Sequence, residues 1–291
     1  MVELDIKLPG NVGEGAVKLA SKVLTATGAN MHCGIKESLT EAHKTIIEAV
    51  VKDERFSIEE RIDFVNAYEW NVKESRKRNK AFVGSIPFLK KDARPEDIDD
   101  NWIVDFFDRV SSVSEKQIDE IWARVLGEKA NDPSKFSKRL LQSLFLMEKD
   151  DAETFLRLTR FCFYDLANLD SVHPIVFLGK KPETYARRGI TDSALTRLQR
   201  LDLIDVDFGR GYSVGKRATL RYGSDTVNVE AESVNVGCVR FTDEGKCLYE
   251  LVAKENESNV FEFTIGLLRS NGCKATVNGV SMSQVLDDTL L

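Results

Sequence analysis

The sequence predicts an α+β protein, with a helical bundle in the first two-thirds and an antiparallel module in the last third. Two patterns predict this class. Between residues 57 and 163, apolar residues recur at helical spacing behind helix start signals. After residue 170, short alternating segments separated by glycine-containing turns are typical of antiparallel strands. We expect a helical arm over 1–56, a helical core over 57–170 and the α+β module over 171–291.

Composition excludes several classes of protein. A chain with 42% hydrophobic and 30% charged residues is ordinary for a soluble globular protein. The longest uncharged run, 23–35, is too short to span a bilayer. Five cysteines without CxxC spacing argue against a disulfide framework and favour a cytoplasmic location. The net charge of −6 disfavours indiscriminate coating of nucleic acid.

The N-terminal arm is expected to hold two helices. In the first, one face carries Val17, Ala20 and Leu24, and the polar face offers only Lys18 and Lys22, which is thin for membrane binding. The second is predicted over 39–53. The first helix could dock on the body of the protein, lie at an oligomer interface or touch a membrane surface; we favour self-association over membrane contact.

A long helix is predicted from 58 to about 82. Ser57 and Glu60 form a capping box at its start. Its far end is rich in Lys and Arg, which suits the helix macrodipole better than it indicates phosphate contact.

The helical core follows a proline-containing connector. Trp102 and Trp122 lie on apolar helix stripes, so we expect core packing for both rather than stacking on a ligand. The predicted start signals in this region are a capping box of Ser114 with Gln117, Asp132 before Pro133, and Asp150 with Glu153; the last of these helices is expected to continue to Phe163.

Four polar residues of the core form a predicted latch. Glu128 is placed to accept a charge-assisted hydrogen bond from Arg139 and to tie two helices together. The full set is Arg124, Glu128, Ser137 and Arg139. We interpret it as structural rather than catalytic.

The last third is expected to be winged-helix-like. A helix capped by Thr191 leads into a strand at 203–208, a hairpin turns near 223–225, and Thr242 caps a further helix. Residues 180–221 carry ten Lys or Arg against five Asp or Glu. The candidate contacts for a partner or for DNA are Arg187, Arg188, Arg197, Arg200, Lys216 and Arg217.

No catalytic set stands out. The glycines of GNVGEG near the N-terminus lack the Lys and Ser/Thr of a phosphate-binding loop. The acidic run at 97–100 is explained by helix capping, although a nuclease would need such acids to hold a metal. We expect no catalytic residues, no metal and no cofactor.

Motifs in order across most of the chain resemble the uncharacterised bacterial domain of unknown function 2806 family. They are D-x-x-W-I from Asp99, V-S-x7-W-A-R-x-L from Val113, P-x-x-F-S-x-R from Pro133, D-A-x-x-F from Asp151 and F-T-x-x-G-x-x-L from Phe241. One departure is the L-G-E at 126–128, where the family typically has an extra small residue. The family has no assigned activity, but its general look is similar to proteins of phage defence of the abortive-infection type.

The leading prediction is a non-enzymatic bacterial interaction or sensor protein of phage defence that forms homo-oligomers and binds a protein partner. The alternative is a DNA-binding regulator that places its 191–202 helix in the major groove. A metal-dependent nuclease is the weaker alternative.

Overall fold

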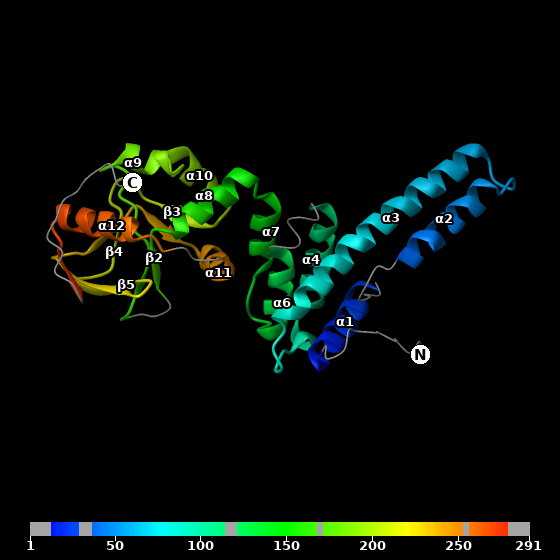
Figure 1. The fold of residues 1–291 in the computed structure, drawn as a ribbon, viewed down its shortest axis with the longest axis horizontal. Helices are drawn as coiled ribbons and strands as arrows, with labels where there is room; N and C mark the ends of the chain where they lie inside the picture. Colours follow the sequence, from blue (N-terminus) through cyan, green and yellow to red (C-terminus); the bar gives the residue numbers. More distant parts are fainter. Residues whose placement is uncertain (1–12, 29–36, 114–120, 168–170, 253–255, 279–291) are drawn as a thin grey trace. The chain divides into compact units, whose positions relative to one another are not determined.

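The computed structural model describes residues 13–28, 37–113, 121–167, 171–252 and 256–278. The chain forms two compact units, Met1–Leu141 and Gln142–Leu291, and the division falls inside one helix (Figure 1). The first unit is helical, and antiparallel sheets occur in the second. The predicted α+β class is therefore confirmed.

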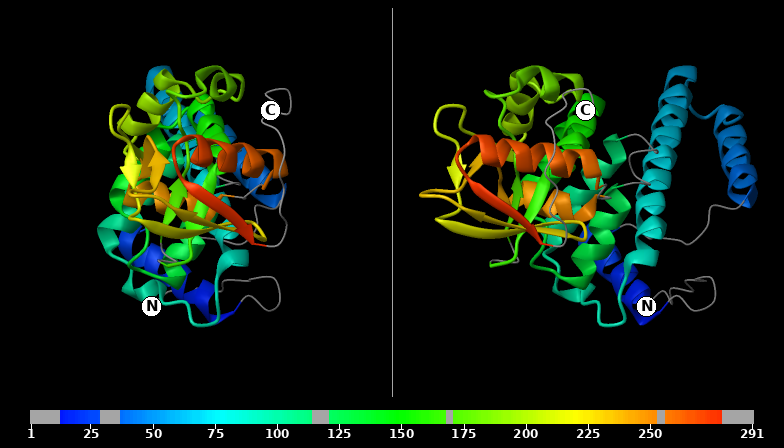
Figure 2. Two further views of the ribbon diagram at one scale, coloured as in Figure 1. Left: turned by 90° about the vertical axis from the view of Figure 1, so that its left-hand side faces the viewer. Right: turned by 60° about the vertical axis from the view of Figure 1, so that its left-hand side comes forward.

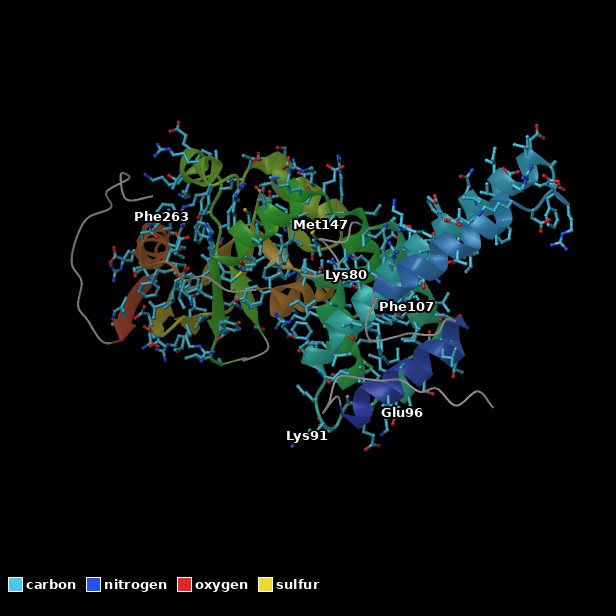
Figure 3. All side chains as sticks on the ribbon, turned by 45° about the vertical axis from the view of Figure 1, so that its right-hand side comes forward. Lys80, Lys91, Glu96, Phe107, Met147 and Phe263 are labelled. Atoms are coloured by element: carbon cyan, nitrogen blue, oxygen red, sulfur yellow. The ribbon has the colours of Figure 1, made fainter. Side chains whose placement is uncertain are left out.

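The described residues of the first unit are mostly helical. Its elements are α1 (Glu14–Thr27), α2 (Glu37–Val51), α3 (Ile58–Ser85), η1 (Ile86–Phe88), η2 (Pro95–Asp97), α4 (Asp100–Ser112), α6 (Ala123–Asn131) and the start of α7 (Lys138–Leu146). Helix α4, which carries the Phe107 labelled in Figure 3, forms the centre. Five apolar side chains along it are almost entirely buried: Trp102, Ile103, Phe106, Phe107 and Val110. The C-terminal half of α3 packs on α4 and α6.

Helix α1 is docked on its own unit. Its buried face carries Ala16, Leu19, Ala20 and Val23, whereas Val17, which we predicted on that face, is 47% exposed. Lys22 pairs with Asp100 at 2.6 Å, and Lys18 pairs with Glu96 at 3.5 Å. The two lysines therefore attach α1 to the elements around η2 and α4.

Several predicted helix starts can be compared with the structure. The capping box of Ser57 and Glu60 is present, with both reciprocal hydrogen bonds. The prediction for Asp132 is wrong: its carboxylate binds Ser134 in a turn, and α7 begins later, where Ser137 accepts a hydrogen bond from the amide of Leu140 at 3.1 Å. The predicted box at Ser114 lies outside the described residues.

The next start is shifted by two residues. The capping box of α8 (Lys149–Thr159) joins Glu148 to Asp151 instead of Asp150 to Glu153. The helix also ends before Phe163, because residues from Cys162 onward enter a strand and pair with two neighbours. Helix α8 and this strand therefore belong to the second unit, not to the predicted helical core.

The second unit combines a five-stranded antiparallel sheet with helices. Its remaining elements are β1 (Cys162–Asp165), β2 (Val172–Pro174), α9 (Pro182–Arg187), α10 (Asp192–Arg200), β3 (Ile204–Val206), β4 (Tyr212–Ser213), β5 (Arg217–Tyr222), β6 (Asp225–Glu230), β7 (Asn235–Gly237), β8 (Val239–Phe241), α11 (Asp243–Leu251), α12 (Ser258–Ser270) and β9 (Lys274–Asn278). The strand order of the large sheet is β2-β1-β5-β6-β9 (Figure 2).

Aromatic packing joins the large sheet to α12. Phe163 of β1 lies 4.8 Å from Tyr222 of β5 and 6.1 Å from Phe261 of α12, measured between ring centroids. The predicted hairpin is present as β5 and β6, which pair from Arg217 with Glu230 to Tyr222 with Asp225.

The order α9, α10, β3, β8 follows the predicted helix-to-strand scheme. Thr191 caps α10 and Thr242 caps α11, as predicted. Strand β3 pairs with β8 in an antiparallel two-stranded sheet. The β5–β6 hairpin lies between them in the chain but belongs to the larger sheet, so the winged-helix resemblance itself stays a prediction.

Candidate functional site

The connection between α2 and α3 is fixed by local polar contacts. Arg61 on the first turn of α3 donates to the carbonyl of Val51 at the end of α2, at 2.6 Å. Arg55 binds the Asp53 carboxylate through Nε and Nη2, and these hydrogen bonds lower the pKa of Asp53 to about 2. The capping box of Ser57 starts α3, and the hydrogen bond from the Ser57 amide lowers the pKa of Glu60. The sequence therefore specifies this helical hairpin locally.

Packing within the hairpin is incomplete. The seam includes the His43 and Tyr68 rings, which meet edge to face with centroids 5.7 Å apart. Every residue from 43 to 78 is described, and none of these side chains is fully buried. Two helices alone cover only part of each other's apolar surface, so the hairpin retains apolar groups in contact with solvent.

Large apolar side chains are exposed on several sides of the hairpin. Phe64 is 52% exposed, although it lies five helical turns before Phe82, on the same side of α3, and Phe82 is completely buried. The exposed set is Ile46, Val51, Phe56, Ile58, Ile62, Phe64 and Trp70. A helix that is apolar on several sides is normally covered by other helices. The set exceeds the isolated apolar residues that are ordinary on a protein surface.

The two halves of α3 carry opposite charge. Residues 58–70 hold four acidic residues and one basic residue, whereas residues 71–85 hold five basic residues and one acidic residue. Within the second half, Lys77 donates to the Ser111 carbonyl and Arg78 donates to the Ser111 hydroxyl. Lys73 and Arg76 are exposed. The exposed surface of the helix therefore changes sign along its length.

The predicted latch lies beside a polar centre that sequence reasoning missed. Lys129 is 6% exposed, and its ammonium group donates to the carbonyls of Lys135 and Phe136. It also lies 5.0 Å from the ring centroid of Trp102, whose Nε1 donates to Phe136 at 2.7 Å. Burial lowers the pKa of Lys129. The sequence shows a lysine between Arg124 and Arg139, but it does not show that this lysine is buried, because burial depends on tertiary packing.

The latch residues themselves have separate contacts. The Glu128 carboxylate accepts a hydrogen bond from Asn131 at 3.4 Å, and the Arg124 guanidinium lies 5.8 Å from the ring centroid of Phe88. Ser137 caps α7. The bond between Glu128 and Arg139 stays a prediction. Trp102 and Trp122, 3% and 2% exposed, are core residues as predicted.

The six predicted basic contacts are distributed over three places in the second unit. Arg187 and Arg188 lie at the end of α9, Arg197 and Arg200 lie on α10, and Lys216 and Arg217 lie at the start of β5. Three are paired with carboxylates: Arg188 with Glu257, Arg197 with Asp151 and Arg217 with Glu230. The six residues therefore come from three places along the chain, and half of them are paired with carboxylates.

Comparison with protein-family models gives one match. The model described as a protein of unknown function, DUF2806, matches residues 79–264. The chain belongs to this family. The comparisons with curated proteins and with solved structures found no match.

The match to the DUF2806 model covers some of the surfaces described above and leaves out others. It begins in the second half of α3 and ends in α12, so it includes the ends of α8 and α9 but not the exposed hairpin. Within the described residues, no helix has the length and apolar character to cross a membrane. The same residues contain no group of three His, Cys, Asp or Glu side chains arranged for a metal ion.

Proposed function

We propose that this DUF2806 protein is a non-enzymatic interaction protein that self-associates through the α2–α3 hairpin. The observation that supports this most directly is the exposure of large apolar side chains around a hairpin whose own seam is only half-buried. Burying such side chains is worth roughly 1.5–3 kcal/mol each, so a second helical surface would be strongly favoured. Helix α1 is not part of this surface, because its apolar face is used within its own unit.

The charges on α3 favour a second copy of the chain as the partner that covers this surface. When α3 packs antiparallel against α3 of another copy, the acidic half of each helix faces the basic half of the other. Opposite charges on facing helices set orientation and partner choice in helical assemblies. A closed two-fold pair also covers the same surface on both chains.

Charge reversal tests this arrangement. Glu59→Lys with Asp63→Lys, and separately Lys73→Glu with Arg76→Glu, should each convert the wild-type oligomer to monomer in sedimentation velocity. Mixing the two variants should restore a complex, because each then offers what the other lacks. Asp225→Lys with Glu232→Lys changes exposed acids of the second unit and serves as the control. A wild-type monomer at micromolar concentration would contradict the proposal.

The role in phage defence is a proposal that rests on the family resemblance alone. It predicts that cells expressing the protein lower the plating efficiency of phage, and that both charge-reversed variants lose this effect. Protection by the monomeric variants would separate defence from self-association. Equal plating with and without the protein, over a panel of phages, would remove the proposal.

DNA binding by the second unit is a second candidate. It is favoured by the order α9, α10, β3, β8, which would present α10 to a groove. Arg197 is paired with Asp151, so Arg200 is the better reporter of phosphate contact. A gel shift that weakens as salt rises, and that is lost in Arg200→Glu, would support this candidate, whereas affinity indifferent to salt would exclude it.

A further inference from the structure

Four arginines converge on one pocket of the second unit. The pocket has a volume of about 430 Å³ and is lined by Arg157, Arg160, Ala186, Arg187, Arg188 and Gly189. Two of the arginines come from the end of α8 and two from the end of α9. A positively charged side chain is stabilised at the C-terminal end of a helix. Here, however, two pairs of arginines from different helices line the same pocket.

The chain ends α9 in a way that presents these arginines. Gly189 has a φ of 71°, and its amide donates to Ala186, while the amide of Ile190 donates to Tyr185. This pattern is a Schellman motif. Tyr185 is completely buried, and its hydroxyl accepts a hydrogen bond from Phe177 at 3.1 Å, so the end of α9 is anchored in the core.

Gly189 also makes room for a guanidinium group. A Cβ atom at this position would overlap Nη1 of Arg157. The Arg157 side chain therefore lies against the backbone at the end of α9, although it belongs to α8. This contact brings the arginines of the two helices together.

Acidic neighbours neutralise only part of this positive charge. Glu257 pairs with Arg160 at 3.2 Å and with Arg188 at 3.0 Å. Glu153 pairs with Arg157 at 2.8 Å. Among the described residues, these ion pairs set two carboxylates against the four guanidinium groups of the pocket, an excess of two positive charges.

Some donor capacity at the pocket is also unused. Among the described residues, Arg187 has no ion pair, and the buried Nε of Arg188 has no acceptor. Gathering cations without an anion costs energy, because like charges repel. The arrangement therefore indicates a place for a doubly charged anion.

We propose that this pocket binds the phosphate group of a small phosphomonoester. Such a group carries about −1.5 to −2 charges at neutral pH and offers three acceptor oxygens, which matches the excess of two guanidinium charges. Guanidinium groups bind phosphate through paired hydrogen bonds. The volume is within the range of small-ligand sites. Since the described lining contains no aromatic ring, recognition rests on the phosphate rather than on a stacked base.

Calorimetric titration of the full chain with ribose 5-phosphate tests the site, with ribose as the uncharged control. Arg157→Gln and Arg187→Gln should each weaken binding about tenfold or more, the effect of losing a charge-assisted hydrogen bond. Arg217→Gln removes an arginine that pairs with Glu230 and lies outside the pocket lining, so it should bind as the wild type does. Gly189→Ala should weaken binding by displacing Arg157.

The outcomes are distinct from those of self-association, because the titration can be repeated on a charge-reversed α3 variant and should give the same affinity. Absence of binding by ribose 5-phosphate at millimolar concentration would overturn the proposal. Equal affinity in Arg157→Gln, Arg187→Gln and the Arg217→Gln control would do so as well. Binding only of a 5′-phosphorylated oligonucleotide, with steep salt dependence, would assign the arginines to nucleic acid instead.

Discussion

The two halves of α3 differ in what covers them, although they form one continuous helix. The second half packs on α4 and α6 and buries Ala81 and Phe82 completely, whereas the first half contacts α2 and buries no side chain fully. The apolar content of a helix therefore does not by itself say where its partner is. In this protein the difference separates a folded core from a surface on which large apolar side chains stay exposed.

The largest expected effect comes from a substitution in the packed half of α3. Phe82→Ala should lower the free energy of unfolding by about 3–5 kcal/mol, because it leaves a cavity in the core. Phe64 lies on the same side of the helix, but its ring is half exposed. Phe64→Ala, made in the charge-reversed monomer, should therefore change the free energy of unfolding by no more than about 0.5 kcal/mol. Urea unfolding of both variants measures the contrast. Equal losses would mean that the first half is also packed.

A smaller loss is expected at the buried lysine beneath the packed half. Lys129→Met keeps the volume of the side chain but leaves the carbonyls of Lys135 and Phe136 without this donor, at a cost of about 1–3 kcal/mol. Lys135→Met, whose side chain belongs to the turn before α7, is the comparison variant. A neutral Lys129→Met would show that water replaces the ammonium group.

Local signals in the sequence predicted the hairpin better than the packed region. Ser57 and Glu60 are three residues apart and complete their box without help from the rest of the chain. Asp132 does not start a helix, because Phe136 has a φ of 54°, which a helix cannot contain. The Phe136 carbonyl accepts hydrogen bonds from Trp102 and Lys129. A backbone conformation of this kind is set by tertiary contacts.

The same reason explains what could be foreseen of the candidate sites. The exposed apolar residues of α3 can be read from the sequence, but an apolar helix face does not show whether its partner is in the same chain. Arg187 and Arg188 stood out as a basic pair. Their convergence with Arg157 and Arg160 required α8 to end at Thr159, where the sequence had predicted a longer helix.

Removing the N-cap of α3 and that of α4 compares the hairpin with the core, with a smaller expected loss of stability. Ser57→Ala and Asp99→Ala each remove a side chain that accepts from the third residue of its helix, Glu60 or Trp102, and such a loss costs about 0.5–2 kcal/mol. Hydrogen exchange should show local opening of the hairpin for Ser57→Ala but a global loss of protection for Asp99→Ala, because α4 is in the core. Global loss in both variants would mean that the hairpin and the core unfold together.

The smallest expected effect is a pH dependence confined to the exposed half. The Ser57 amide donates to the Glu60 carboxylate, and the pKa of Glu60 is lowered from its ordinary value of 4.5. A carboxyl whose pKa is lower in the folded state stabilises that state above pH 4.5, and the contribution is lost as the pH falls through the lowered pKa. Acidification should therefore speed hydrogen exchange in the first turn of α3 before it affects α4.

Glu60→Gln tests the origin of this pH dependence. Its side chain can still reach the Ser57 amide but carries no titrating group, so exchange in the first turn should lose its acid response once the intrinsic pH dependence of exchange is subtracted. Unchanged acid sensitivity in Glu60→Gln would assign it to another carboxylate. One other carboxylate of this connection is Asp53, whose pKa the hydrogen bonds from Arg55 lower to about 2.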